Sequence, residues 1–109
     1  MTYLCVAIFV HDIAQAKQQI AQASEAGADL VELRIDHFTD PPLVAQLLNE
    51  SILPAIITCR ASWEGGDCQL PDDQRAELLA SPATAAARYV DVELEALRRT
   101  GARFPDRQL

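Results

Sequence analysis

Residues 30–36 read Leu-Val-Glu-Leu-Arg-Ile-Asp, and their polarity alternates with the two-residue period of a β-strand. One face of this strand would carry the apolar side chains of Val31, Leu33 and Ile35. The charged side chains of Glu32, Arg34 and Asp36 would share the other face with the first leucine. A helix-like segment ends just before this strand, at residues 26–28, and another follows it. This order predicts a crossover unit and hence a parallel sheet, and parallel sheets are normally covered on both faces.

Three charges on a covered face are costly unless they line a polar cavity, so we interpret Glu32, Arg34 and Asp36 as pointing into one. The alternative is an edge strand with a solvated face, on which Glu32 and Arg34 would form a surface ion pair. A second strand, over residues 89–95, repeats the alternation with three carboxylates on one face: Asp91, Glu93 and Glu95. This repetition favours the shared cavity.

Two further strands complete a series of strand-helix units. Residues 4–10 form a continuous apolar run, which is typical of a strand covered on both faces, and residues 55–60 form a strand that ends in Arg60. Helices are predicted after each of the first three strands. Asp12 caps the first helix and Gly27 closes it, Asp40 caps the second, and the third starts near Asp72. A fragment of a fourth helix is predicted over residues 96–99. The fold class is therefore α/β. In a barrel of this class, charged residues at the carboxyl ends of the strands face the mouth, where the site would lie.

Length and composition indicate a single domain over residues 1–109, with residues 104–109 as a loose tail. The net charge of −7 disfavours nucleic acid as a partner. No stretch approaches the ~20 apolar residues of a membrane span, and the start carries no export signal. We therefore expect a cytoplasmic protein that binds neither nucleic acid nor membrane.

The cysteines and the longest loop complete the inventory of candidate chemistry. The sequence has three cysteines, an odd number, and no C-x-x-C spacing among them: Cys5, Cys59 and Cys68. It therefore predicts reduced thiols rather than a disulfide framework or a zinc site. Residues 61–70 form a polar, glycine-bearing loop that is too long for a tight connection. This loop is predicted to serve the site.

Three motifs carry a resemblance to a known family: Glu32-Leu33-Arg34-Ile35-Asp36, then Thr58-Cys59-Arg60 followed by Glu64-Gly65-Gly66, then Asp91-Val92-Glu93-Leu94. In this order and spacing they resemble the first half of type I 3-dehydroquinate dehydratase (3-dehydroquinase), an enzyme of the shikimate pathway. The resemblance covers roughly residues 3–95. It implies the first half of a TIM-type (β/α)8 barrel, whose full length is typically ~250 residues.

The resemblance also implies roles for individual residues. Glu32 and Arg34 would hold the ring hydroxyls of the substrate, Arg60 would contact the substrate at the mouth, and Glu64 would orient the catalytic histidine. Asp36, Asp91 and Glu93 would lie behind them and hold the arginines in place by charged hydrogen bonds. Ala7 departs from the family, since relatives can carry a serine there. The reaction needs no metal or organic cofactor.

The family converts 3-dehydroquinate to 3-dehydroshikimate through an imine (Schiff base) between a lysine and the substrate ketone, while a histidine moves protons. Lys17 is the single lysine of the sequence, and it lies in the middle of a predicted outer helix rather than at a strand end. His11 and His37 do not match the family histidine, so we expect both to have capping or surface roles. This chain alone is therefore expected to be inactive.

Three hypotheses about function remain open. The chain is a truncated piece of a type I dehydroquinase that carries half of the substrate site, or a non-catalytic module that binds a small polyhydroxy carboxylate. Alternatively, it is an assembly piece whose unpaired strand edges recruit another copy, as a homo-oligomer, or the missing half of the barrel.

Overall fold

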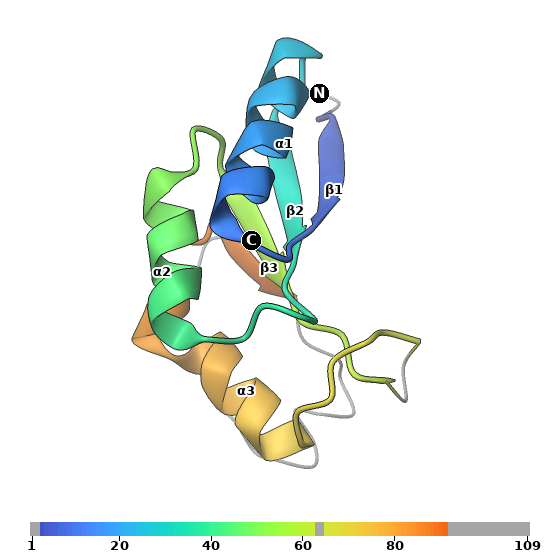
Figure 1. Cartoon of the computed structure of the whole chain (residues 1–109), viewed down its shortest axis with the longest axis vertical. Coiled ribbons are helices and arrows are strands. Elements are labelled where there is room, and N and C mark those ends of the chain that lie inside the picture. Colours follow the sequence, from blue (N-terminus) through green and yellow to red (C-terminus); the bar gives the residue numbers. More distant parts are fainter. Residues whose placement is uncertain (1–2, 63–64, 92–109) are drawn as a thin grey trace.

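Four parallel strands form one sheet in the order β1-β2-β3-β4, and helices connect consecutive strands (Figure 1). The computed structural model describes residues 3–62 and 65–91. Its elements are β1 (Cys5–Phe9), α1 (Ile13–Glu25), β2 (Leu30–Arg34), α2 (Pro41–Glu50), β3 (Ala55–Thr58), α3 (Asp72–Ala80), the 3₁₀-helix η2 (Pro82–Thr84) and β4 (Tyr89–Asp91). The predicted parallel α/β fold is confirmed.

The register of the sheet brings the carboxyl ends of the strands to one edge. Arg34, the last residue of β2, is paired with Phe9 at the end of β1 and with Thr58 at the end of β3. Thr58 in turn is paired with Asp91 at the end of β4. Residues that directly follow the strands therefore lie close together, although long stretches of sequence separate them.

One face of the sheet forms the hydrophobic core with the helices. Val31, Leu33 and Ile35 are 0% exposed, as the alternation in the sequence predicts. They belong to the same buried cluster as Ile20 of α1 and Leu47 of α2. Figure 1 shows α1 and α2 side by side over this face of the sheet. The charged residues of β2 consequently project from the opposite face.

The helix caps agree with the sequence in part. Asp12 caps α1 by accepting a hydrogen bond from the backbone N–H of Gln15 at 2.7 Å, and Gly27 closes the helix with a φ of 95°. Asp40 occupies the N-cap position of α2, but its side chain makes no capping hydrogen bond. Prolines occupy the first two positions of α2, so Pro42 removes one of the two N–H groups that a cap at Asp40 could use, while the N–H of Leu43 remains.

The prediction that the first strand is covered on both faces is wrong. Cys5 and Ala7 are exposed, and the Phe9 side chain is 56% exposed. β1 has β2 as its one neighbour within the described sheet, and α1 covers only the face that carries Ile8. An apolar run therefore does not establish that both faces are buried.

Several predictions fall on residues that the structure does not describe. The continuation of the fourth strand over residues 92–95, the helical fragment over residues 96–99 and the loose tail over residues 104–109 all lie outside the described residues. Within residues 3–62 and 65–91, no helix combines the length and apolar character needed to cross a membrane.

Candidate functional site

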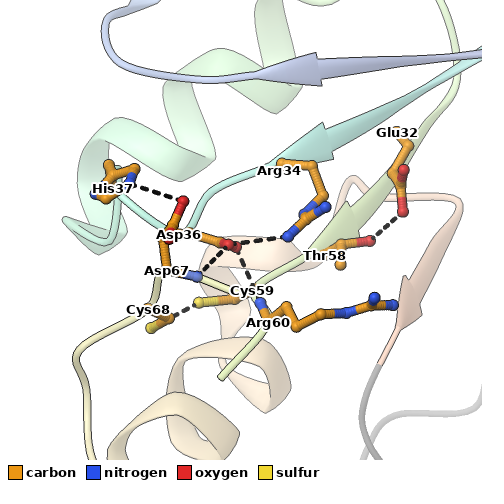
Figure 2. Close-up of polar contacts among 9 residues, drawn as sticks. All are labelled: Glu32, Arg34, Asp36, His37, Thr58, Cys59, Arg60, Asp67 and Cys68. Carbon is orange, nitrogen blue, oxygen red and sulfur yellow. Dashed lines mark hydrogen bonds and ion pairs between the residues drawn. The ribbon is translucent and has the colours of Figure 1, made fainter. Parts of the chain in front are cut away.

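The carboxylate of Asp36 is the centre of a polar cluster at the carboxyl ends of β2 and β3 (Figure 2). Asp36 is buried two residues beyond the end of β2. It accepts hydrogen bonds from the backbone N–H of Arg60 at 2.9 Å, from the backbone N–H of Asp67 at 3.0 Å and from Arg34 Nη2 at 2.9 Å. One side chain thus joins the ends of two strands to the loop that follows β3.

These hydrogen bonds determine the charge state of Asp36. Burial by itself raises the pKa of the carboxyl, but the bonds from the Asp67 and Arg60 amides, together with the hydrogen bond and positive charge of Arg34, outweigh it and hold the pKa below its usual value. Asp36 is therefore ionised at neutral pH. A buried carboxylate with this many donors is well suited to hold a guanidinium in one orientation.

The Arg34 guanidinium lies between the Asp36 carboxylate and the aromatic ring of Phe9. Its central carbon is 5.1 Å from the centroid of the Phe9 ring, a distance that permits a cation–π interaction. The side chain is 16% exposed, and its Nε atom is buried with no hydrogen-bond partner among the described residues. Arg34 is therefore held in position by Asp36 and Phe9.

Glu32 and Thr58 form a second polar contact in the same cluster. Thr58 Oγ1 donates a hydrogen bond to the Glu32 carboxylate at 3.0 Å, across the β2–β3 pair. Thr58 is buried and Glu32 is half-buried. Glu32 and Arg34 are therefore each partly buried and each paired, on the face of the sheet opposite α1 and α2, and the polar cavity predicted for them stays a prediction.

Arg60 approaches this cluster from β3. In Figure 2 its side chain extends away from the Cys59–Cys68 pair, toward the side on which Glu32 and Thr58 lie. Arg60 is an exposed residue, while its backbone N–H is bound by Asp36. Gly66 packs so closely on Arg60 that a Cβ at position 66 would collide with the Arg60 carbonyl oxygen. The second glycine of the Glu64-Gly65-Gly66 motif is thus required for this close approach.

Three of the predicted site residues cannot be placed in this cluster. Glu64 and Glu93 lie outside the described residues. Asp91 is the last described residue of β4, and its backbone is paired with Thr58. The role predicted for each of these carboxylates stays a prediction, as do the substrate-binding roles of Glu32, Arg34 and Arg60.

Lys17 lies away from the polar cluster, whereas His37 lies at its edge beside Asp67 and His11 stacks on His37. Lys17 Nζ is 2.8 Å from Glu50 Oε1, in an exposed ion pair between α1 and α2. The exposed rings of His11 and His37 stack with their centroids 5.6 Å apart, and His37 Nε2 is 3.5 Å from Asp67 Oδ2. These positions agree with the predicted outer-helix place of Lys17 and the predicted surface roles of the histidines. Among the described residues, no group of three or more potential ligands could hold a metal ion.

Sequence reasoning missed two side chains and one backbone group of the cluster. Phe9 is the register partner of Arg34, and the ends of the two predicted strands could have indicated this pairing. Thr58 shares the face of Arg60, but nothing in the sequence identified Glu32 as its partner. The Asp67 amide had no signal at all, because its contact with Asp36 depends on the path of the loop.

Parallel strand-helix units whose strands follow one another across the sheet in sequence order, with charged residues at the strands' carboxyl ends, are typical of the class of (β/α) barrel proteins. A family model described as type I 3-dehydroquinase matches residues 4–104. The chain therefore belongs to the type I 3-dehydroquinase family.

Curated relatives carry the same assignment. The chain is 34% identical over 95 residues to the chloroplastic bifunctional 3-dehydroquinate dehydratase/shikimate dehydrogenase of Arabidopsis thaliana, covering 84% of this chain and 16% of that protein. It is 34% identical over 99 residues to the 3-dehydroquinate dehydratase of Methanothermobacter thermautotrophicus, covering 89% of this chain and 44% of that enzyme. The chain thus spans less than half the length of these relatives.

Solved structures show the same fold. The type I 3-dehydroquinate dehydratase of Clostridium difficile superimposes with a TM-score of 0.76 at 24% identity, over 90% of this chain and 44% of that one. The 3-dehydroquinate dehydratase of Geobacillus kaustophilus gives a TM-score of 0.76 at 23% identity, over 91% of this chain and 42% of that one. The four described strands therefore correspond to part of a TIM barrel.

Proposed function

We propose that this chain supplies the substrate-binding part of a 3-dehydroquinate dehydratase site. In this proposal Glu32 and Arg34 hold the ring hydroxyls of the substrate, and Arg60 contacts it at the mouth. Glu64 orients the catalytic histidine. The carboxylates that hold the arginines in place are Asp36, Asp91 and Glu93.

The observation that carries the proposal is the Asp36-centred cluster. Asp36 binds the Arg34 side chain and the Arg60 backbone at the same time, so two guanidinium groups originate from neighbouring strand ends. A chain with a net charge of −7 can attract an anionic substrate only where such cations are concentrated. Glu32 next to Arg34 adds an acceptor for hydroxyl groups, which suits a polyhydroxy carboxylate.

The covalent half of the reaction has no residue to carry it in the described site. Imine formation needs an amine that can lose its proton at the substrate ketone. Lys17 is paired with Glu50 between α1 and α2, on the side of the sheet away from the polar cluster. We therefore propose that this chain alone binds the substrate without turning it over, and that a lysine and a histidine from another polypeptide segment complete the site.

Titration of the 109-residue chain with quinate, followed by backbone amide NMR, tests the binding. We expect saturable shifts at Arg34, Arg60 and Asp67, and their loss in the Arg34→Gln and Arg60→Gln variants. Arg88→Gln is the matched control, because it removes the same charge from an exposed residue just before β4, at the opposite end of the strands. Unchanged binding in Arg34→Gln and Arg60→Gln, or equal loss in Arg88→Gln, would contradict the proposal.

A turnover assay tests the proposal that this chain alone is inactive. We expect no dehydration of 3-dehydroquinate by the purified chain. Turnover that borohydride abolishes in the presence of substrate would show that the chain forms the imine itself, and would overturn the assignment of Lys17 to a surface role.

A second candidate function is assembly, and the exposed edge of the sheet favours it. The outer side of β1 has no strand neighbour among the described residues, and Tyr3, Leu4 and Phe9 are exposed there. An open groove of about 570 Å³ runs between β1 and α1. In this proposal the edge pairs with another copy or with the other half of the barrel. A concentration-independent monomer in light scattering would contradict self-association, and an unchanged hydrodynamic mass after mixing with a C-terminal half-barrel would contradict complementation.

We also propose a single folding unit with a cytoplasmic location. The described core is one continuous cluster that includes residues of the helices and of the first three strands, and the three cysteines are free. We expect one cooperative urea transition that is identical by fluorescence and circular dichroism. Two separated transitions would contradict the single folding unit. Recovery of the protein in exported fractions would contradict the cytoplasmic location.

A further inference from the structure

Two buried thiols face each other beneath the polar cluster. Cys59 directly follows β3, Cys68 lies before α3, and each residue is 1% exposed. The Cys59 Sγ donates to the Cys68 Sγ at 3.1 Å, and both cysteines are free. The sulfur atoms are about 1 Å further apart than the ~2.05 Å of a disulfide bond. Figure 2 shows the pair on the opposite side of Asp36 from the arginine side chains.

The two cysteines bracket residues 60–67, which we call the Arg60 loop, and the base of this loop is already closed by hydrogen bonds. The backbone N–H of Cys68 donates to the Arg60 carbonyl at 3.1 Å, and the N–H of Gly66 donates to the Ala61 carbonyl at 2.9 Å. Asp36 binds the amides at both ends of the loop. The fold therefore holds the two sulfur atoms together at a much higher effective concentration than the unfolded chain would.

We propose that Cys59 and Cys68 form a reversible thiol–disulfide site that locks the Arg60 loop when oxidised. This inference goes beyond substrate binding and does not depend on the proposed function, because it rests on the two sulfur atoms and the loop between them. Oxidation would fix the base of the loop covalently, whereas reduction would leave it held by hydrogen bonds alone.

The oxidant in this proposal is a small-molecule disulfide such as glutathione disulfide. One protein thiolate attacks a glutathione sulfur, forms a mixed disulfide and releases one glutathione thiolate. The second protein thiol loses its proton and attacks the protein sulfur of the mixed disulfide, which forms the Cys59–Cys68 bond and releases the second glutathione thiolate. The two protein sulfurs are oxidised, the glutathione disulfide is reduced, and the two protons leave with the glutathione thiols.

Burial makes this site slow to react in the closed loop. Burial, followed by the hydrogen bond and the charge of Cys68, raises the pKa of the Cys59 thiol, so little thiolate is present at neutral pH. Exchange therefore requires local opening of the Arg60 loop. Cys5 is exposed and would be a more accessible thiol, so the test needs a variant that lacks it.

The experiment equilibrates the Cys5→Ser chain in glutathione redox buffers, followed by acid quenching, thiol counting and peptide mapping without reduction. We expect both thiols to disappear together and a peptide linked through Cys59 and Cys68. The disulfide should raise Tm by roughly 10–15 °C over the reduced chain. The matched control is Cys5→Ser combined with Cys68→Ala, in which the same buffers should leave Tm unchanged.

Repeating the equilibration in denaturing urea separates a site built by the fold from ordinary cysteine chemistry. We expect the equilibrium constant for the disulfide, measured against glutathione, to be on the order of 100-fold larger in the folded chain than in urea. Equal constants in the two conditions would overturn the proposal. Glutathione adducts on Cys59 or Cys68 without a cross-link, or thiols that stay reduced in the folded chain but oxidise in urea, would overturn it as well.

Discussion

The two faces of β2 show how one strand combines two kinds of stabilisation. On the helix-covered face, Val31 and Leu33 contribute apolar area that is completely removed from water. On the other face, Glu32 and Arg34 are partly buried, and each is held by a specific partner. Hydrophobic burial is non-directional, whereas a buried polar group costs free energy unless its partner is correctly placed. The first face therefore mainly sets stability, and the second mainly sets geometry.

The largest effect is expected from breaking the apolar face. Leu33→Ala removes a side chain that is 0% exposed and leaves a cavity, so the free energy of unfolding should fall by about 3–4 kcal/mol. Glu32→Ala, at the adjacent position on the other face, is the matched control and should cost about 1 kcal/mol. Urea denaturation measures both variants. Equal losses would show that the two faces do not differ as described.

The next effect is expected at the centre of the polar face. Asp36→Asn removes the charge that three donors bind, so unfolding should become easier by about 2–3 kcal/mol at pH 7. Urea denaturation at constant ionic strength measures the difference. A loss below that of Glu32→Ala would contradict the central position of Asp36.

The pH dependence of stability sharpens the same comparison. The pKa of Asp36 is lowered in the folded chain, so its contribution is complete above the unfolded pKa of about 3.9 and is lost as the pH falls through the folded pKa. The free energy of unfolding should therefore decrease with acidification below about pH 4, and less steeply in Asp36→Asn. Parallel pH profiles of the two proteins would contradict the assignment.

A smaller effect is expected from the contact across the strands. Thr58→Val keeps the shape of the side chain but removes the donor to Glu32, so the free energy of unfolding should fall by about 1 kcal/mol. A double-mutant cycle with Glu32→Ala, which removes the acceptor, isolates the pair. Full additivity of the two substitutions would show that the hydrogen bond contributes nothing measurable.

The smallest effect is expected at the ion pair between the helices. Lys17 and Glu50 are both well exposed, and solvent screens such pairs. The midpoint of thermal unfolding should stay within measurement error in Lys17→Gln and in Glu50→Gln. A shift comparable to that of Asp36→Asn would remove the distinction between exposed and buried ion pairs in this chain.

Local sequence rules predicted the elements well, and they failed where neighbours in space decide. The cap at Asp12 and the turn at Gly27 depend on a few adjacent residues, so they could be predicted. The exposure of Phe9 could not, because an apolar run does not reveal what lies on its second face. The missing side-chain cap at Asp40 could not be predicted either, because Leu43 still offers the backbone N–H that corresponds to the Gln15 donor used by Asp12.

The sequence by itself determined the strand-helix order and the face of β2 on which the charges lie, because the two-residue period of an extended backbone is a local property. Only the tertiary structure decided which groups meet there. Asp36 binds amides 24 and 31 positions further along the chain, and Cys59 meets Cys68 nine positions further along. Such contacts depend on strand register and on the path of the Arg60 loop, which are set by the packing of segments that are distant in the sequence.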